Sequence, residues 1–143
     1  MALLSVGRSS SREHSSAEYS VPFFRDDGRF SRIWRVPELL ITTGVRRAVE
    51  VNYSLFDNSS EAEAIYAVYR KRWLSRYWQD RGIDIAVDLN VPDKYALLNL
   101  DGVPRGWRSF VTRGYRDRYQ SLVDEYGRAV EHCGDKSAVE FLV

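Results

Sequence analysis

Arginines between Arg105 and Arg118 are the residues with the clearest chemical potential. This stretch holds five arginines and a single acid, Asp117. A planar guanidinium can pair with two oxygens of one phosphate, and a helix N-terminus also favours anions. We therefore predict nucleic-acid contacts here, at a predicted strand end and helix start: Arg108, Arg113, Arg116 and Arg118. The alternative is a solvated basic loop.

A second basic segment, residues 69–78, also contains aromatic side chains that could stack on nucleic-acid bases. Arg70 and Arg76 are its candidate phosphate contacts. Helical spacing, however, directs Tyr69, Trp73 and Tyr77 towards the core. The alternative interpretation is therefore that this segment is structural.

Arg72 lies at the edge of that apolar stripe, where an unpaired guanidinium would be unfavourable. We expect it to be at least half buried and paired with Asp26, Asp27 or Asp57. These three acids and Asp88 are also weak catalytic candidates. If they converged, they could hold Mg²⁺ for phosphodiester chemistry. Taken singly, each is expected to be a cap, a turn former or an arginine partner.

Other signatures of chemistry are missing from the sequence. It has no phosphate-binding Walker loop, dinucleotide glycine fingerprint, nucleophile elbow or zinc signature. Cys133 is the only cysteine, so neither an internal disulfide nor a thiolate metal site is expected. We predict no metal site and no cofactor, with Mg²⁺ required only by the nuclease alternative. Whether the protein is an enzyme is left undecided.

Strand and helix patterns alternate along the chain. Predicted strands cover residues 47–55, 83–89, 108–112 and 138–143, and predicted helices cover 60–81, 92–99 and 116–133, after one or two short helices beyond Pro22. The order β-α-β-α-β-α-β indicates an α/β fold with a small parallel sheet and right-handed crossovers. The sheet is either a four-stranded layer or half of a barrel.

The helix at 60–81 begins with a capping box, in which Ser60 caps and Glu63 follows three residues later. Two apolar stripes run along it. The broader stripe, expected to face the core, consists of Ala62, Ile65, Tyr66, Tyr69, Trp73 and Tyr77. The narrower stripe of Ala67, Leu74 and Trp78 is either covered as well or offers Trp78 to a partner.

Ligands of parallel α/β sheets bind where the strands end. Polar residues at these ends are expected to gather on one rim of the sheet, and they are Asn52, Ser54, Asp88, Asn90 and Thr112. That rim is the predicted position of any small-molecule or metal site.

Composition indicates an ordinary globular protein of 143 residues, with 44% hydrophobic residues and a net charge of +1. We predict a flexible, serine-rich tail at residues 1–20 and one α/β domain at 21–143. A net charge near zero excludes strong general attraction to nucleic acid or acidic membranes, so binding would need a local patch. The sequence has no apolar run long enough to span a membrane and no signal-peptide core, so we expect a cytoplasmic protein.

Four segments together resemble the domain of unknown function 4417, a family of phage, plasmid and prokaryotic proteins. They are residues 26–30 with Trp34 and Pro37, residues 53–56, residues 69–73 with 77–79, and residues 101–104. The resemblance covers about residues 22–143. The family tends to have an acid where Asn52 stands and a Ser-Trp pair near Leu89-Asn90. The resemblance implies a mobile-element setting and an α/β fold, and it implies no particular reaction.

Three functions follow from these patterns. The first is an accessory protein of a phage or plasmid that binds nucleic acid through arginine-rich loops, for instance in replication. The second is a metal-dependent phosphodiesterase or nuclease. The third is an interaction or assembly component that binds a protein through Trp78 or the final strand. No membrane partner is expected.

Overall fold

The computed structural model describes residues 27–114 and 117–143, so the predicted tail at residues 1–20 lies outside the described residues. The chain forms an α/β fold, as predicted. Its elements are α1 (Asp27–Arg35), α2 (Glu38–Ile41), β1 (Arg47–Val49), α3 (Glu61–Gln79), β2 (Asp84–Asp88), η1 (Asp93–Tyr95), η2 (Leu98–Leu100), β3 (Ser109–Val111), α4 (Tyr119–Cys133) and β4 (Glu140–Leu142). The predicted helix at 92–99 is replaced by the two short 3₁₀ turns η1 and η2.

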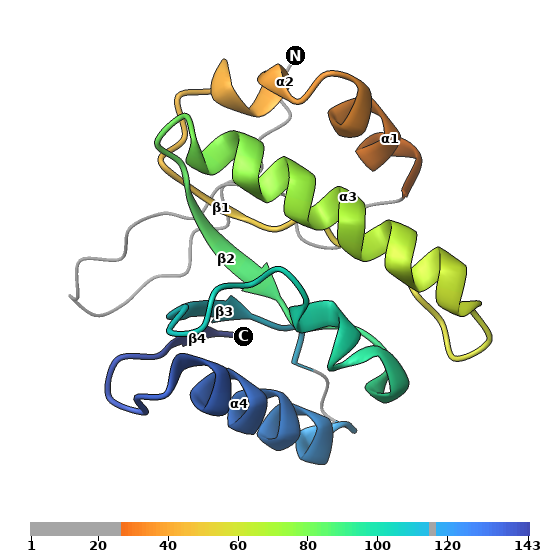
Figure 1. Ribbon diagram of the computed structural model, residues 1–143, viewed down its shortest axis with the longest axis vertical. Helices are drawn as coiled ribbons and strands as arrows, with labels where there is room; N and C mark the ends of the chain where they lie inside the picture. The colour runs from red at the N-terminus through yellow and green to blue at the C-terminus, as the bar shows by residue number, and fades with distance from the viewer. Residues whose placement is uncertain (1–26, 115–116) are drawn as a thin grey trace.

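The four strands form one parallel sheet in the order β1-β2-β3-β4. The register pairs Ala48 with Ile85, Val87 with Phe110, and Phe110 with Phe141. Right-handed connections between parallel strands in chain order place successive crossovers on the same face of a sheet. In Figure 1, α3, the η1–η2 segment and α4 follow one another around the sheet. The carboxyl ends of the strands therefore meet at one rim.

The capping box of α3 forms as predicted. The Ser60 hydroxyl accepts from the Glu63 backbone N–H at 3.2 Å, and the Glu63 carboxylate accepts from the Ser60 backbone N–H at 2.7 Å. Both bonds satisfy backbone donors that the helix leaves without intrahelical partners. The start of α3 is thus fixed by its own local sequence.

The orientation of α3 is the opposite of the predicted one. The buried face carries Ala64, Ala67, Val68, Lys71, Leu74, Ser75 and Trp78. From the stripe predicted to face the core, Ile65, Tyr66, Tyr69 and Trp73 are 42–54% exposed. The small side chains of Ala64 and Ala67 on the buried face let α3 lie close to the sheet. The polar side chains on the same face, Lys71 and Ser75, have a buried partner in Glu50. The large rings would have kept the helix further away.

Trp78 is completely buried. Of the two alternatives left open by the sequence, the narrower stripe is therefore covered, and Trp78 is not available to a protein partner. Its indole N–H donates to the Pro37 carbonyl at 2.9 Å, which links α3 to the start of α2. In Figure 1, α1 and α2 lie above α3, on the side away from β2. Trp78 packs in a core cluster with Phe30, Leu40 and Ile85, from α1, α2 and β2.

A second core cluster joins α4 to the sheet through Val87, Phe110, Ala129 and Cys133.

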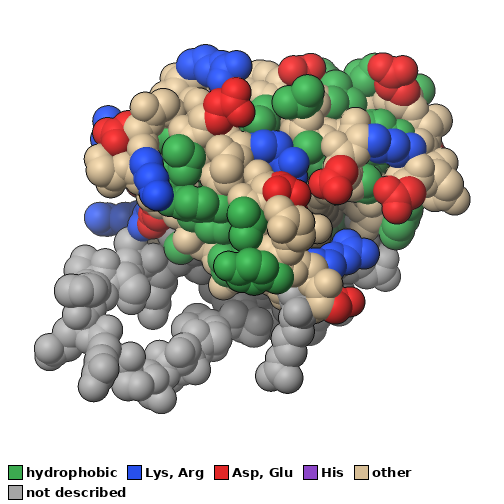
Figure 2. Space-filling model, turned by 90° about the horizontal axis from the view of Figure 1, so that it is seen from below, with side chains coloured by type: hydrophobic (Ala, Val, Ile, Leu, Met, Phe, Trp, Pro, Cys, Tyr) green, Lys and Arg blue, Asp and Glu red, His purple; other side chains and the backbone are tan. Residues whose placement is uncertain are grey.

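In Figure 2, the face seen from below mixes basic and acidic side chains without an extended patch of one sign. Among the described residues, no helix combines the length and apolar character required to cross a bilayer.

Candidate functional site

A buried network of charged side chains joins α3 to the sheet beneath the rim. Glu50, one residue past β1, is buried and forms ion pairs with Lys71 and Arg72. The Lys71 ammonium also donates to the Asn99 side chain at 2.7 Å, and the Ser75 hydroxyl donates to Glu50 at 3.1 Å. Burial acts to raise the pKa of Glu50, but the charges of Arg72 and Lys71 and their hydrogen bonds outweigh it, so the pKa is lowered. The predicted pairing of Arg72 with a carboxylate is confirmed, although its partner is none of the three aspartates expected.

Arg72 also fixes the turn that follows η2. Its guanidinium donates to the carbonyls of Asn99 and Asp101, the latter at 2.8 Å. Gly102 has a φ of +77°, and a Cβ there would lie 3.3 Å from the Arg72 side chain. The Asp101-Gly102 turn therefore needs glycine for its backbone conformation and for its contact with α3.

Asp88, the last residue of β2, is buried beside this network. One carboxylate oxygen accepts from the Asn90 backbone N–H at 3.0 Å, whereas the other oxygen, Oδ2, is buried without a hydrogen-bond partner. Burial raises the pKa of Asp88 to about 6, against a lowering effect of the Lys71 charge. A side chain this enclosed cannot reach a substrate directly, so we assign Asp88 a structural role.

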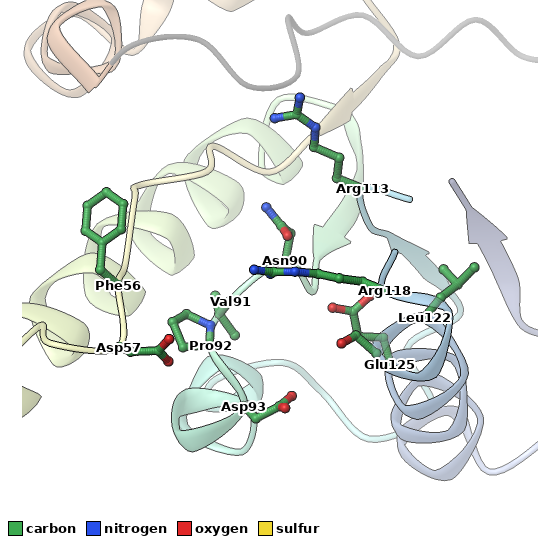
Figure 3. Close-up of a pocket in the computed structure, with 11 residues that line it drawn as sticks. Phe56, Asp57, Asn90, Val91, Pro92, Asp93, Arg113, Arg118, Leu122 and Glu125 are labelled. Carbon is green, nitrogen blue, oxygen red and sulfur yellow. The ribbon is translucent and has the colours of Figure 1, made fainter. Parts of the chain in front are cut away.

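A cavity of about 400 Å³ opens at the carboxyl rim of the sheet, where ligands of α/β proteins bind. It is lined by the β1–α3 loop, the segment after β2, and the ends of β3 and α4, through Phe56, Asp57, Asn90, Val91, Pro92, Asp93, Arg113, Arg118, Ser121, Leu122 and Glu125. In Figure 3, Phe56 and Asp57 lie across the cavity from α4, and Arg118 extends between them towards Asn90. We refer to this site as the rim cavity.

Two arginines reach the rim cavity from different elements. Arg113 follows β3, and Arg118 is the N-cap residue of the 15-residue helix α4. Both side chains are exposed. The Arg118 side chain does not cap its own helix, so it is directed into the cavity instead of back to the first turn. The cavity therefore combines two guanidiniums with a helix N-terminus, a combination that suits phosphate groups.

Three carboxylates also line the rim cavity: Glu125 on α4 beside Arg118, Asp93 in η1, and Asp57 on the β1–α3 loop. Glu125 accepts a hydrogen bond from the buried Thr112 hydroxyl at 2.5 Å, and burial raises the pKa of Glu125 while that bond acts to lower it. Asp93 lies 3.6 Å from the Arg128 guanidinium. Asp57 is exposed on the β1–α3 loop. These groups accept hydrogen bonds from donors, such as the amino groups of nucleobases.

The loop that carries Phe56 is fixed by the η1 turn. The Lys94 ammonium donates to the carbonyls of Asp57 and Ser59, the latter at 3.2 Å, and the Tyr95 hydroxyl also donates to Ser59. Phe56 itself is 63% exposed. An aromatic ring therefore stands at the mouth of the cavity on a loop with several anchors.

The two catalytic candidates with described side chains, Asp57 and Asp88, do not converge. Asp26 lies outside the described residues, and Asp27 begins α1. Asp57 lines the rim cavity, whereas Asp88 is buried below it. In the part of the chain that the structure describes, no group of three acids, histidines or cysteines could hold a metal ion.

The arginine cluster predicted from the sequence separates into two groups. Arg113 and Arg118 share the rim cavity, but Arg108 precedes β3 and lines a different hollow at the opposite end of the sheet. Arg108 and Arg113 are five positions apart, which corresponds to about 17 Å along an extended strand. Arg116 lies outside the described residues.

The other two predicted contacts lie on α3, away from the rim cavity. The Arg70 guanidinium stacks over the rings of Tyr53 and Tyr66, and Arg76 pairs with Asp80 at 3.0 Å. Of the predicted nucleic-acid residues that the structure describes, Arg113 and Arg118 lie at the rim cavity, whereas Arg108, Arg70 and Arg76 do not.

Sequence reasoning placed Asn90 and Thr112 at this rim but missed Phe56, Asp93 and Glu125 as cavity residues. Asp93 follows Pro92 a few residues after the predicted strand at 83–89, and this position after a strand end indicates the rim of the sheet. Glu125 lies on a helix face, and only its bond to Thr112 shows that it turns inwards.

A family described as a domain of unknown function, DUF4417, matches residues 2–123. The chain belongs to this family. The match starts and ends earlier than the region 22–143 expected from the resemblance, and it includes the predicted tail.

Two curated relatives are the Gene 1 proteins of Mycobacterium phages D29 and L5. Each is 36% identical over 88 residues, which is 59% of this chain but only 32% and 38% of the respective relative. The chain thus spans about a third of the length of the curated relatives it matches. No solved structure matches. The family and these relatives associate the chain with phage proteins, as the resemblance implied.

Proposed function

We propose that this protein is a phage-associated accessory protein that binds nucleic acid at the rim cavity. The observation that carries the proposal is the meeting of Arg113 and Arg118, from two elements, at a cavity beside the start of α4. Each guanidinium can bind a phosphate oxygen pair, and the helix N-terminus adds a favourable partial charge.

The remaining lining residues support a nucleotide rather than a bare anion as the ligand. Phe56 offers a ring for stacking, while Asp57, Asn90 and Asp93 offer hydrogen-bond acceptors. An unpaired nucleotide presents a base edge, a ring face and a phosphate together, so it can use all of these groups at once. The volume of about 400 Å³ is within the range of pockets that hold small ligands.

The overall charge of +1 limits what this binding can be. A protein without a strong general field gains little from non-specific phosphate contacts. We therefore infer a modest affinity for nucleic acid that depends on a few contacts at the rim cavity. Such an affinity fits an accessory role, and the ligand would be a strand end or an unpaired segment.

The experiment is fluorescence anisotropy with labelled oligonucleotides at low salt, about 50 mM. Wild-type protein should bind, and the double variant Arg113→Ala/Arg118→Ala should lose roughly tenfold or more in affinity, because two charge-assisted contacts are removed. Arg108→Ala is the matched control, since it removes an exposed arginine at the other end of β3. Circular dichroism of each variant checks that the fold is retained. Equal affinity of the double variant and wild type would contradict the proposal.

A further inference from the structure

The solvent-facing side of α3 carries a continuous row of aromatic rings. We call it the aromatic row: Trp34, Tyr66, Tyr69, Trp73 and Tyr77. Tyr66 and Tyr69 are stacked with centroids 6.5 Å apart, as are Trp73 and Tyr77 at 5.3 Å, and Trp34 from α1 lies edge-on between the two pairs. From Tyr66 to Tyr77 the row covers twelve residues of α3, and the rise between its first and last residue is about 16 Å.

Three of the five rings in the aromatic row are exposed, and Trp34 and Tyr77 are partly buried against the core. Tyr66, Tyr69 and Trp73 are 50%, 54% and 42% exposed. Isolated exposed rings are common on protein surfaces, whereas a contiguous exposed apolar patch rimmed by polar residues is typical of an interaction site.

Arginines lie flat against both ends of the aromatic row. The Arg70 guanidinium is 4.4 Å from the Tyr66 ring centroid, and that of Arg81 is 3.5 Å from the Tyr77 centroid. An arginine that stacks on a ring keeps N–H groups at its edge for a phosphate. The last turn of α1 adds two exposed arginines, Arg32 and Arg35, beside Trp34.

The acids that border the aromatic row are already engaged. Glu38, which also lies near Arg81, accepts from the Tyr77 hydroxyl at 2.6 Å. Glu63 belongs to the α3 capping box, and Asp80 pairs with Arg76. Among the described residues, no salt bridge joins a carboxylate to the stacked arginines Arg70 and Arg81.

We propose that the aromatic row with its flanking arginines is a second nucleic-acid contact surface, and that its ligand is a single strand. The proposal rests on the proposed function and specifies the substrate class. Unpaired bases can stack on exposed rings while phosphates meet the arginines, and this arrangement is typical of single-strand binding. Paired bases are stacked inside a duplex and cannot reach the rings. Association of two copies through this face would place arginines against arginines, which disfavours a dimer.

The basic-aromatic motif at residues 69–73 thus serves two purposes. Lys71 and Arg72 point into the buried network and hold α3 on the sheet. Tyr69 and Trp73 are exposed on the surface, and the partly buried Arg70 guanidinium lies between the rings of Tyr53 and Tyr66 at its edge. Arg70, a predicted nucleic-acid contact, acts here and not at the rim cavity.

The test compares a labelled oligothymidylate of about 20 nucleotides, longer than a usual single-strand site, with a duplex of the same length. Wild-type protein should bind the single strand at least tenfold more tightly. Tyr66→Ala/Tyr69→Ala should lower single-strand affinity roughly tenfold or more while leaving its salt dependence unchanged, because stacking releases no counterions. Tyr69→Phe keeps the ring and should retain the affinity. Leu97→Ser is the control for loss of an exposed apolar side chain elsewhere, since Leu97 is 78% exposed.

A measurement on wild-type protein guards against unfolded variants. Ultraviolet crosslinking to the oligothymidylate, followed by peptide mapping, should identify peptides with Tyr66, Tyr69 or Trp73. Crosslinks confined to other peptides, or equal affinity for single strand and duplex, would overturn the inference while the rim-cavity proposal could still hold. The inference would also be overturned if light scattering showed that the wild-type protein is a dimer, and if Tyr66→Ala/Tyr69→Ala dissociated this dimer but left the single-strand affinity unchanged. Failure of wild-type protein to bind any nucleic acid would overturn both proposals.

Discussion

Charged residues in the interior of this protein show what can and cannot be predicted for single side chains. The sequence predicts that Arg72 pairs with an acid, because a guanidinium at the edge of a core needs a partner. It does not predict Glu50 as that partner, since the strand pattern gives Glu50 no special status. Lys71 is even harder to predict, because burial of a lysine depends on Glu50 and Asn99 being brought together by the fold.

Replacing Glu50 with Gln should destabilise the fold by about 3 kcal/mol, because Lys71 and Arg72 would remain buried without a countercharge. The measurement is chemical denaturation at neutral pH. Arg47→Ala is a suitable comparison, since its partner Glu140 is partly exposed and a pair of that kind contributes about 1 kcal/mol or less. A loss for Glu50→Gln no larger than for Arg47→Ala would contradict the account of the network.

Asp88 should make stability depend on pH. Its pKa in the folded protein, about 6, lies above the ordinary value of 3.8, so the folded state holds the proton more tightly. The stability that this group contributes is therefore full at low pH and is lost as the pH rises through about 6. Asp88→Asn imitates the protonated form, so it should be more stable than wild type near pH 7.5, by on the order of 1–3 kcal/mol. The gain should shrink towards about pH 4.5. Denaturation curves that show the same difference at both pH values would contradict this.

At the scale of elements, the order is predicted well, but the strand predicted at 47–55 ends at Val49, the helix predicted at 92–99 is two 3₁₀ turns, and the orientation of α3 is not predicted. Alternation of strand and helix patterns and the capping box of Ser60 are local signals, so they can be read directly. The face of a helix that is buried depends on what it packs against. On α3, large rings suggested one face, whereas the close approach to the sheet selected the face with Ala64, Ala67 and Ser75.

Two substitutions on α3 distinguish the two orientations. Leu74 is completely buried and Ile65 is 51% exposed. Leu74→Ala should cost about 3 kcal/mol of unfolding free energy, through lost burial and a cavity, while Ile65→Ala should cost less than about 1 kcal/mol. Urea denaturation of both variants provides the measurement. The reverse order would support the orientation expected from the sequence.

At the scale of the whole molecule, the parallel sheet has the consequence that the sequence analysis expected, because it gathers the strand ends at one rim. Asn90 and Arg113 meet there because their strands are adjacent and parallel. The predicted strand at residues 108–112 implies that Arg108 and Arg113 lie at opposite ends of it, so their closeness in the chain is not a sufficient reason to group them in one patch. Among the described arginines predicted to contact nucleic acid in this stretch, Arg108 lies at one end of the sheet and Arg113 and Arg118 lie at the other, where they combine with a cavity and a helix N-terminus.

The salt dependence of single-strand binding tests the central claim most directly. The logarithm of the binding constant should fall linearly with the logarithm of salt concentration, because each phosphate contact releases counterions. Removing Arg113 and Arg118 together should make this slope shallower by about 1.4, from about 0.7 per contact on single strands. The Arg108→Ala control should leave the slope of wild type unchanged. Identical slopes for wild type and the double variant, or no binding by wild type at about 50 mM salt, would contradict nucleic-acid binding at the rim cavity.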